Sequence, residues 1–102
     1  MWRRLKLILL AIDPGTNILG YCIIEYDTTI VTMKYGHIKT SLWPKTFIGF
    51  MNKTEEFARS QKADMFAVER TFAGAAAIKS TKLVAMTEVL IEAFKRKGEV
   101  KV

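Results

Sequence analysis

The chain has 102 residues, of which 50% are hydrophobic, and its formal net charge is +6. This length allows one small domain, residues 1–102, with a hydrophobic core, and excludes a multidomain protein. The positive charge favours a polyanionic partner, with nucleic acid ahead of an anionic membrane, although a charge of this size also serves solubility alone.

The N-terminal region carries none of the usual export signals. The apolar run over residues 7–12 is shorter than a secretion signal requires, and Asp13 and Pro14 follow it in place of a small-residue cleavage site. No stretch reaches the apolar length of a membrane span. The single cysteine, Cys22, excludes an internal disulfide and fits a reducing compartment. We therefore expect a soluble, cytoplasmic protein without a membrane partner.

The first forty residues predict three strands. The segment from Leu5 to Ile12 is apolar on both faces after Lys6, which is typical of a central strand. Residues 20–26 and 30–40 predict two further strands. Because short turns separate them, we expect an antiparallel meander.

The remainder predicts two helices, each followed by a strand. Apolar residues recur at helical spacing over residues 45–60, with Pro44 near the first turn. Residues 65–68 form a short apolar strand that ends on Glu69. A long helix is expected from about residue 78 to residue 97, before Gly98, and residues 99–102 begin another strand. The predicted order is therefore β-β-β-α-β-α-β.

Two carboxylates directly follow apolar strands, and the predicted topology brings them together. A strand reached through a helix returns parallel to the first, so the strand ending at Glu69 should lie beside the strand ending at Asp13. Open α/β sheets bind ligands at that edge. Neighbouring carboxylates repel unless a cation neutralises them, and Mg²⁺ accepts such oxygen ligands. In a basic protein this arrangement indicates metal-assisted phosphodiester chemistry.

Three segments resemble the RuvC Holliday-junction resolvases, in the family's order and over nearly the whole chain. They are Ile12-Asp13-Pro14-Gly15-Thr16-Asn17 with Gly20-Tyr21, then Gly36-His37-Ile38-Lys39-Thr40, then Phe66-Ala67-Val68-Glu69-Arg70 with Phe72. The resemblance implies a ribonuclease H-like α/β fold with a mixed sheet of three antiparallel and then parallel strands. It further implies an endonuclease that resolves four-way DNA junctions.

The resemblance also assigns roles to residues. Asp13 and Glu69 would be catalytic acids that bind Mg²⁺, with Mn²⁺ as an alternative and no small-molecule cofactor. Phe72 would lie near the cleavage site and stack on or wedge a base of the branched DNA, although a phenylalanine is more often a core residue. Lys79 and Lys82 are candidate phosphate contacts or ordinary solvated lysines.

The family's long helix lies at a homodimer interface, and the sequence independently supports such an interface. Apolar residues wrap this helix well beyond one stripe, so two of its sides should be covered. One side would pack on the sheet, and no other predicted element is available for the second. Two-fold pairing also matches the symmetry of a four-way junction. The predicted interface residues are Leu83, Met86, Leu90 and Phe94.

The chain departs from the family at its C-terminal end. RuvC proteins carry two further acids on a helix after the fifth strand, and the acids that follow Glu69 here are Glu88, Glu92 and Glu99, none in that context. The final helix and the second metal site are therefore missing from these residues. The sequence corresponds to the N-terminal two-thirds of the family domain. It is either a fragment of a longer protein or a shortened relative that binds without cutting.

Other interpretations remain open. Asp13-Pro14-Gly15 could serve only as a turn, because Asp caps turns and Pro-Gly shapes them. Sugar kinases, actin and chaperone ATPases also begin with a strand ending in Asp-x-Gly-Thr, but they need a second domain that 102 residues cannot supply. The YqgF-type branch of the same fold, acting on RNA, is a nearer alternative. A non-catalytic, dimeric nucleic-acid-binding module of the same fold is the other alternative. We attach no chemistry to His37.

Overall fold

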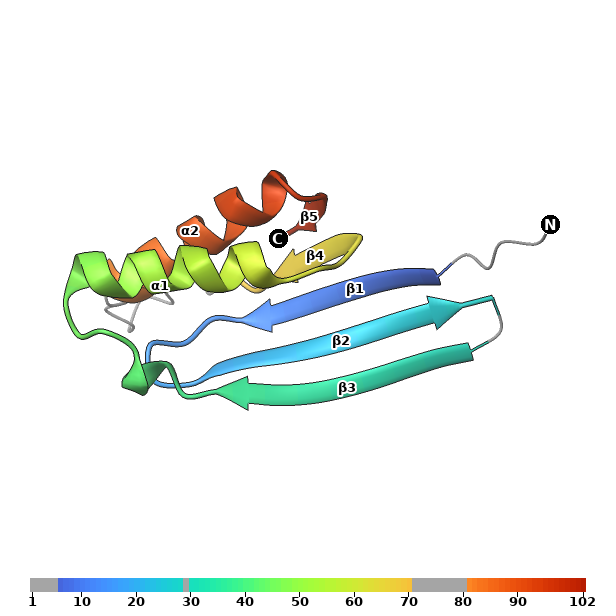
Figure 1. The fold of residues 1–102 in the computed structure, drawn as a ribbon, viewed down its shortest axis with the longest axis horizontal. Coiled ribbons are helices and arrows are strands. Elements are labelled where there is room, and N and C mark those ends of the chain that lie inside the picture. Colours follow the sequence, from blue (N-terminus) through green and yellow to red (C-terminus); the bar gives the residue numbers. More distant parts are fainter. Residues whose placement is uncertain (1–5, 29, 71–80) are drawn as a thin grey trace.

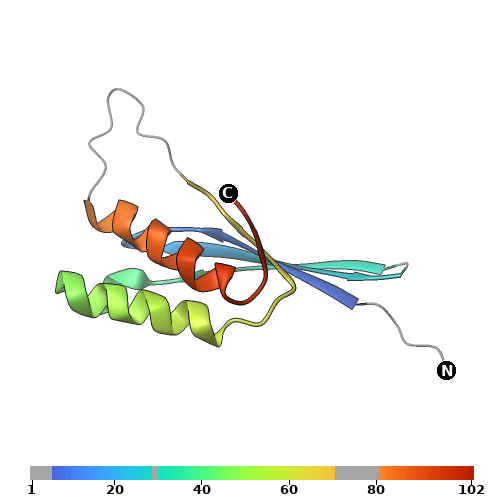
Figure 2. The ribbon, with the colours of Figure 1, turned by 90° about the horizontal axis from the view of Figure 1, so that it is seen from above.

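A computed structural model of the chain describes residues 6–28, 30–70 and 81–102. These residues form a five-stranded sheet with two α-helices that lie side by side over it (Figures 1 and 2). The strand order is β3-β2-β1-β4-β5, with β1, β2 and β3 antiparallel and β4 and β5 parallel to β1. The predicted order of elements and the mixed α/β sheet are confirmed.

The strands and helices begin and end close to the predicted residues. Their bounds are β1 Lys6–Asp13, β2 Leu19–Asp27, β3 Ile30–Ile38, α1 Phe47–Ser60, β4 Met65–Val68, α2 Thr81–Lys95 and β5 Glu99–Lys101. The third strand ends before the predicted residue 40 because the 3₁₀ helix Thr40–Leu42 follows it. In the part of the chain described, neither helix is long and apolar enough to cross a membrane.

Helix α1 begins two residues later than predicted. Thr46 is its N-cap, and the Thr46 hydroxyl accepts a hydrogen bond from the Gly49 amide at 3.1 Å. Pro44 therefore lies before the helix and not in its first turn. A threonine cap satisfies an amide at the helix start that has no partner within the helix, and this explains why the helix begins after Thr46.

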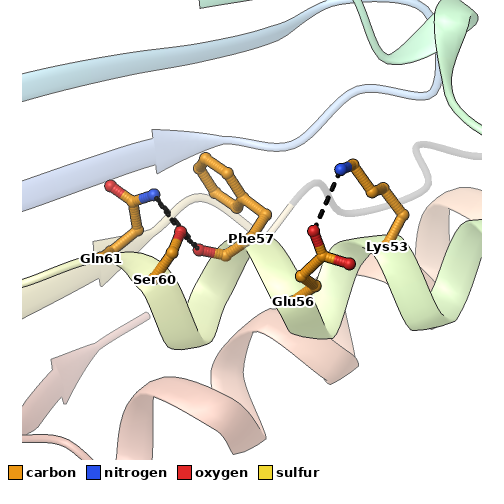
Figure 3. A network of polar contacts seen from close by, with 5 residues as sticks. All are labelled: Lys53, Glu56, Phe57, Ser60 and Gln61. Atoms are coloured by element: carbon orange, nitrogen blue, oxygen red, sulfur yellow. Dashed lines mark hydrogen bonds and ion pairs between the residues drawn. The ribbon is translucent and has the colours of Figure 1, made fainter.

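The C-terminal end of α1 is closed by polar side chains (Figure 3). The Ser60 hydroxyl donates to the Phe57 carbonyl at 2.7 Å, and the Gln61 side-chain amide donates to the same carbonyl at 3.2 Å. These bonds replace those that the end of a helix loses. One turn earlier, Lys53 and Glu56 form an exposed ion pair at 3.2 Å. The ion pair lies on the exposed side of α1, while Phe50, Thr54 and Ala58 are buried on its other side.

The hydrophobic core lies between the two helices and one face of the sheet. The rings of Phe66 on β4 and Phe94 on α2 stack at 4.3 Å and 11°. The sheet contributes residues that alternate along each strand, because successive side chains point to opposite faces. The fully or nearly buried members are Leu10, Ile12, Leu19, Phe50, Ala58, Phe66, Val68, Met86, Leu90, Ile91, Ala93 and Phe94.

The burial of α2 corrects the predicted dimer interface. Met86, Leu90 and Phe94 have no exposed surface within this single chain, so no partner can contact them, and their assignment to a dimer interface is wrong. The second apolar side of α2, for which the sequence offered no cover, packs on α1. Leu83 is half-buried, and its role at an interface remains a prediction.

Candidate functional site

The two predicted acids lie at the adjacent ends of two parallel strands. Asp13 is the last residue of β1, and Glu69 directly follows β4. Ile12 and Val68 are register partners, and the Glu69 amide donates to the Ile12 carbonyl at 2.9 Å. Backbone pairing therefore places the two acids at the ends of neighbouring strands, which lie about 4.8 Å apart in a sheet.

Both acids belong to the sheet face that points away from the helices. Ile12 and Val68 are 2% exposed and face the core, so the alternation along each strand turns the residues after them to the opposite side. We call this side the open face. Asp13 and Glu69 are both exposed there.

A row of polar and small residues crosses the open face at this end of the sheet. Register pairing aligns Asp13 with Gly20 and Gly20 with His37, and Glu69 extends the row beyond Asp13. A Cβ placed on Gly20 would lie 3.7 Å from the Asp13 Cβ and 3.9 Å from the His37 Cδ2. The missing side chain at Gly20 therefore leaves a gap between Asp13 and His37. We call these four residues the polar row.

The turn after Asp13 is held by the segment that follows β3. The Thr40 hydroxyl, which is 1% exposed, donates to the Gly15 carbonyl at 2.6 Å, and the Ser41 amide donates to the Asn17 carbonyl at 3.0 Å. Gly15 is required here, because a Cβ at this position would lie 1.9 Å from the Ile18 carbonyl oxygen. The chain thus builds a rigid turn beside the Asp13 carboxylate.

A hollow of about 750 Å³ lies over the polar row and the next row of the open face, Ala11–Cys22–Tyr35. Lys101 of β5 also lines it, and its ammonium group contacts Glu99 at 3.2 Å. The hollow thus has a mainly apolar floor with the polar row at one end, and Lys101 belongs to the neighbouring row, where Ala67 lies between it and Ala11.

The described residues provide two of the oxygen ligands that a metal needs and no complete set. Within residues 6–28, 30–70 and 81–102, no group of three or more His, Cys, Asp and Glu side chains is close enough to hold a metal ion. Two neighbouring carboxylates nevertheless fit Mg²⁺, which often takes one or two protein carboxylates and completes its shell with water and phosphate oxygens. The two carboxylates therefore suit Mg²⁺ chemically, but they are fewer than the ligands that the ion needs.

The other predicted site residues are not all near this edge. Phe72 and Lys79 lie outside the described residues. Lys82 lies in the first turn of α2 on the opposite side of the sheet, where its ammonium group lies 4.1 Å from the centre of the Phe50 ring. A cation over an aromatic ring is a stabilising intramolecular contact. The structure thus gives Lys82 a role within the fold, and its contact with DNA remains a prediction.

Arg70 directly follows Glu69 and pairs away from it. Its guanidinium pairs with Glu88 of α2 at 3.0 Å rather than with the adjacent Glu69. Both side chains are about half exposed, so the pair adds little stability. It does link the end of β4 to α2 and leaves the Glu69 carboxylate free of it.

Sequence reasoning missed the place of His37 and Lys101 in this site. The signal for His37 was present in the hairpin, because pairing β2 with β3 through a short turn puts residue 37 opposite residue 20. Lys101 required the register of a second parallel pair, β4 with β5, which the sequence does not specify.

Comparison with solved structures finds the same fold in a known protein. Thermus thermophilus RuvC matches with a TM-score of 0.65 and 16% identity, over 92% of this chain and 61% of that one. The same RuvC in complex with a Holliday junction substrate matches with a TM-score of 0.60 and 15% identity, over 92% and 62%. This chain thus spans about three-fifths of their length. The likeness shows a ribonuclease H-like fold. No family model and no curated protein matches the sequence.

Proposed function

We propose that this chain is the junction-binding, acid-bearing part of a RuvC-like nuclease that cleaves branched DNA in the presence of a divalent metal ion. The observation that carries the proposal is the position of Asp13 and Glu69 on the same face at adjacent ends of parallel strands. The fold shared with RuvC, one structure of which holds a Holliday junction, supports branched DNA as the substrate.

Each residue of the site has a distinct task in this proposal. The Asp13 and Glu69 carboxylates would hold the metal ion, which supplies charge neutralisation at the scissile phosphate and a more acidic bound water. The backbone hydrogen bond from Glu69 to Ile12 holds the backbones of the two acids side by side before the substrate binds. The rigid turn through Gly15 keeps the Asp13 carboxylate in place, and positioning of this kind lowers the entropic part of the barrier.

The test is cleavage of a synthetic four-way DNA junction with Mg²⁺ and, separately, with Mn²⁺. Asp13→Asn keeps the size of the side chain and removes its charge, so cleavage should fall by about a hundredfold or more because a metal ligand is lost. Glu92→Gln is the matched control, since Glu92 is an exposed acid on α2 that forms a 4.0 Å pair with Lys95.

The outcomes separate the possibilities clearly. If the wild-type chain cuts and Asp13→Asn cuts equally well, the assignment of the site is wrong. A matched junction made of RNA, tested in parallel, distinguishes a DNA nuclease from an RNA nuclease of the same fold. If the chain cleaves only the RNA junction, RNA and not DNA is the substrate.

A second candidate function is binding of branched DNA without cleavage. The observation that favours it is the absence of a third metal-ligating side chain near Asp13 and Glu69 among the residues described. This function predicts that junction binding, measured by fluorescence anisotropy, is unchanged in Asp13→Asn while neither protein cuts. Loss of binding in the variant would count against it.

A further inference from the structure

The short 3₁₀ helix Thr40–Leu42 presents a leucine to water close to the candidate site. This helix lies between β3 and α1, beside the turn that joins β1 to β2 (Figure 1). Leu42 is 80% exposed, the largest exposed fraction of any large apolar side chain among the described residues. A single exposed leucine is ordinary by itself. This one, however, is held on a rigid support and lies between two lysines.

The 3₁₀ helix is anchored from its inner side. Residues three apart lie on the same side of such a helix. Thr40 and Trp43 form the inner pair: Thr40 is 1% exposed, and the Trp43 ring lies 5.4 Å from the ring of Phe50. Lys39 and Leu42 form the outer pair, and the Leu42 amide donates to the Lys39 carbonyl at 3.1 Å. The outer pair is therefore presented from a fixed backbone.

The charge around Leu42 is positive and is not neutralised by nearby acids. Residues 28–54 contain four lysines and no aspartate or glutamate. Lys39 and Lys45 lie three residues before and three residues after Leu42, and both are exposed. The Lys45 ammonium donates to the Ser41 carbonyl at 3.0 Å. Among the described residues, no acid pairs with Lys39 or Lys45, whereas six other lysine and arginine side chains do have an acidic partner.

This surface lies next to the turn that follows Asp13. The Thr40 hydroxyl and the Ser41 amide bond to the carbonyls of Gly15 and Asn17. Gly15 is two residues from Asp13, a distance of at most about 7 Å along the chain. Nucleotides of one DNA strand follow each other about every 3.4 Å along the helix axis. A strand that passes Asp13 therefore reaches the 3₁₀ helix within a few nucleotides.

We propose that Leu42 enters the branch point of a DNA junction and packs against unstacked bases, while Lys39 and Lys45 bind phosphates on either side. Proteins that deform DNA insert apolar side chains, leucine among them, between base steps. Lysines supply the accompanying phosphate contacts. A protein partner suits this surface less, because lysine is depleted at protein–protein interfaces. The inference rests on the binding of branched DNA in the proposed function, but not on its cleavage.

The inserted side chain should distinguish a junction from a linear duplex. Separating stacked base pairs costs free energy, and the cost is lowest where bases are already unpaired or unstacked. The branch point is where the stacking of the arms is interrupted, so Leu42 should add affinity there and little affinity for a linear duplex. Phosphates are present on both DNAs, so Lys39 and Lys45 should contribute to both.

The first experiment measures fluorescence anisotropy with a four-way DNA junction and with a linear duplex, in buffer without divalent metal. Leu42→Ala should weaken junction binding by about threefold to tenfold and duplex binding by less than about twofold. Val31→Ala is the matched control, since Val31 is 60% exposed at the other end of β3. Circular dichroism checks that each variant keeps the fold.

The lysines are tested by the salt dependence of the same binding. Lys39→Gln and Lys45→Gln should each weaken binding to both DNAs, and each should lower the slope of log affinity against log salt concentration by about one. Lys62→Gln is the matched control, because Lys62 is an exposed lysine beyond the opposite end of α1 from Lys45. It should leave the slope unchanged.

The second experiment detects the insertion directly. A junction that carries 2-aminopurine at the branch point becomes more fluorescent when that base is unstacked. Binding of the wild-type chain should raise the fluorescence, and the rise should be lost in Leu42→Ala at a protein concentration that saturates the junction. Lys39→Gln, compared at saturation, should keep the rise.

The outcomes separate this inference from the proposed nuclease activity. A wild-type chain that binds the junction no more tightly than the duplex overturns the inference, and so does a Leu42→Ala variant with unchanged affinity and an unchanged fluorescence rise. If the chain cuts junctions while Leu42→Ala and Lys39→Gln bind as the wild type does, the nuclease proposal stands and this inference fails. If the predicted losses occur in a chain that never cuts, this inference stands and the nuclease proposal fails.

Discussion

At the scale of single residues, the turn after Asp13 depends on Gly15 for a steric reason. The described glycines all have negative φ angles, so what matters at Gly15 is space and not backbone conformation. Its missing side chain faces the Ile18 carbonyl, while that of Gly20 faces only side chains at ordinary contact distances. The two glycines flank the same carboxylate and differ in what a methyl group would meet.

Gly15→Ala should therefore destabilise the protein by about 1–3 kcal/mol, because a backbone carbonyl must move to admit the methyl group. Gly20→Ala should change stability by less than about 1 kcal/mol, since glycine inside a strand already carries an entropic cost that alanine removes. Urea unfolding followed by circular dichroism measures both. Equal losses in the two variants would show that the close approach at Gly15 is not a constraint.

At the scale of elements, α2 packs on two neighbours within its own chain. The helix presents apolar residues to α1 as well as to the sheet, so much of its wide apolar surface is covered within one molecule. Val84, by contrast, is 51% exposed on the same helix. Core and surface positions of α2 can thus be compared directly.

Leu90→Ala should lower the free energy of unfolding by about 2–5 kcal/mol through the cavity that it creates, and the loss should not depend on protein concentration. Val84→Ala, which removes a similar apolar group from an exposed site, should cost less than about 1 kcal/mol. Thermal unfolding at two protein concentrations tests both. If the stability lost in Leu90→Ala depends on protein concentration, Leu90 lies at a subunit interface after all.

The sequence predicted most elements because apolar runs and turn residues are local signals. β4 was predicted over residues 65–68 and spans Met65–Val68. The start of α1 was predicted two residues too early, because it depends on a hydrogen bond from the helix backbone to the Thr46 side chain that forms only in the folded chain. The second cover of α2 was missed because helix-to-helix packing is a tertiary contact. Asp13 and Glu69 could be placed from strand order alone, whereas His37 needed the register across three strands.

At the scale of the whole molecule, net charge and shape both bear on the binding of a polyanion. The net charge of +6 attracts a polyanion from any direction. The molecule measures 53 × 29 × 22 Å, and its long axis follows β1, β2 and β3 (Figure 1).

Junction binding should weaken about tenfold to a hundredfold when salt rises from about 50 to about 200 mM, because lysine and arginine contacts to phosphate release counterions. Fluorescence anisotropy at the two salt concentrations measures this change. A salt-insensitive affinity for DNA would mean that the net charge has no part in binding.

The pairing of β1 with β4 has a consequence for the order in which the site is assembled during folding. Asp13 belongs to a hairpin whose partners lie close in sequence, but Glu69 arrives with a strand whose first register pair, Leu9 with Met65, closes a loop of 56 residues. Contacts between distant residues form late because loop closure costs entropy. The two carboxylates therefore meet only near the end of folding. Any local opening that releases β4 separates them while the hairpin itself survives.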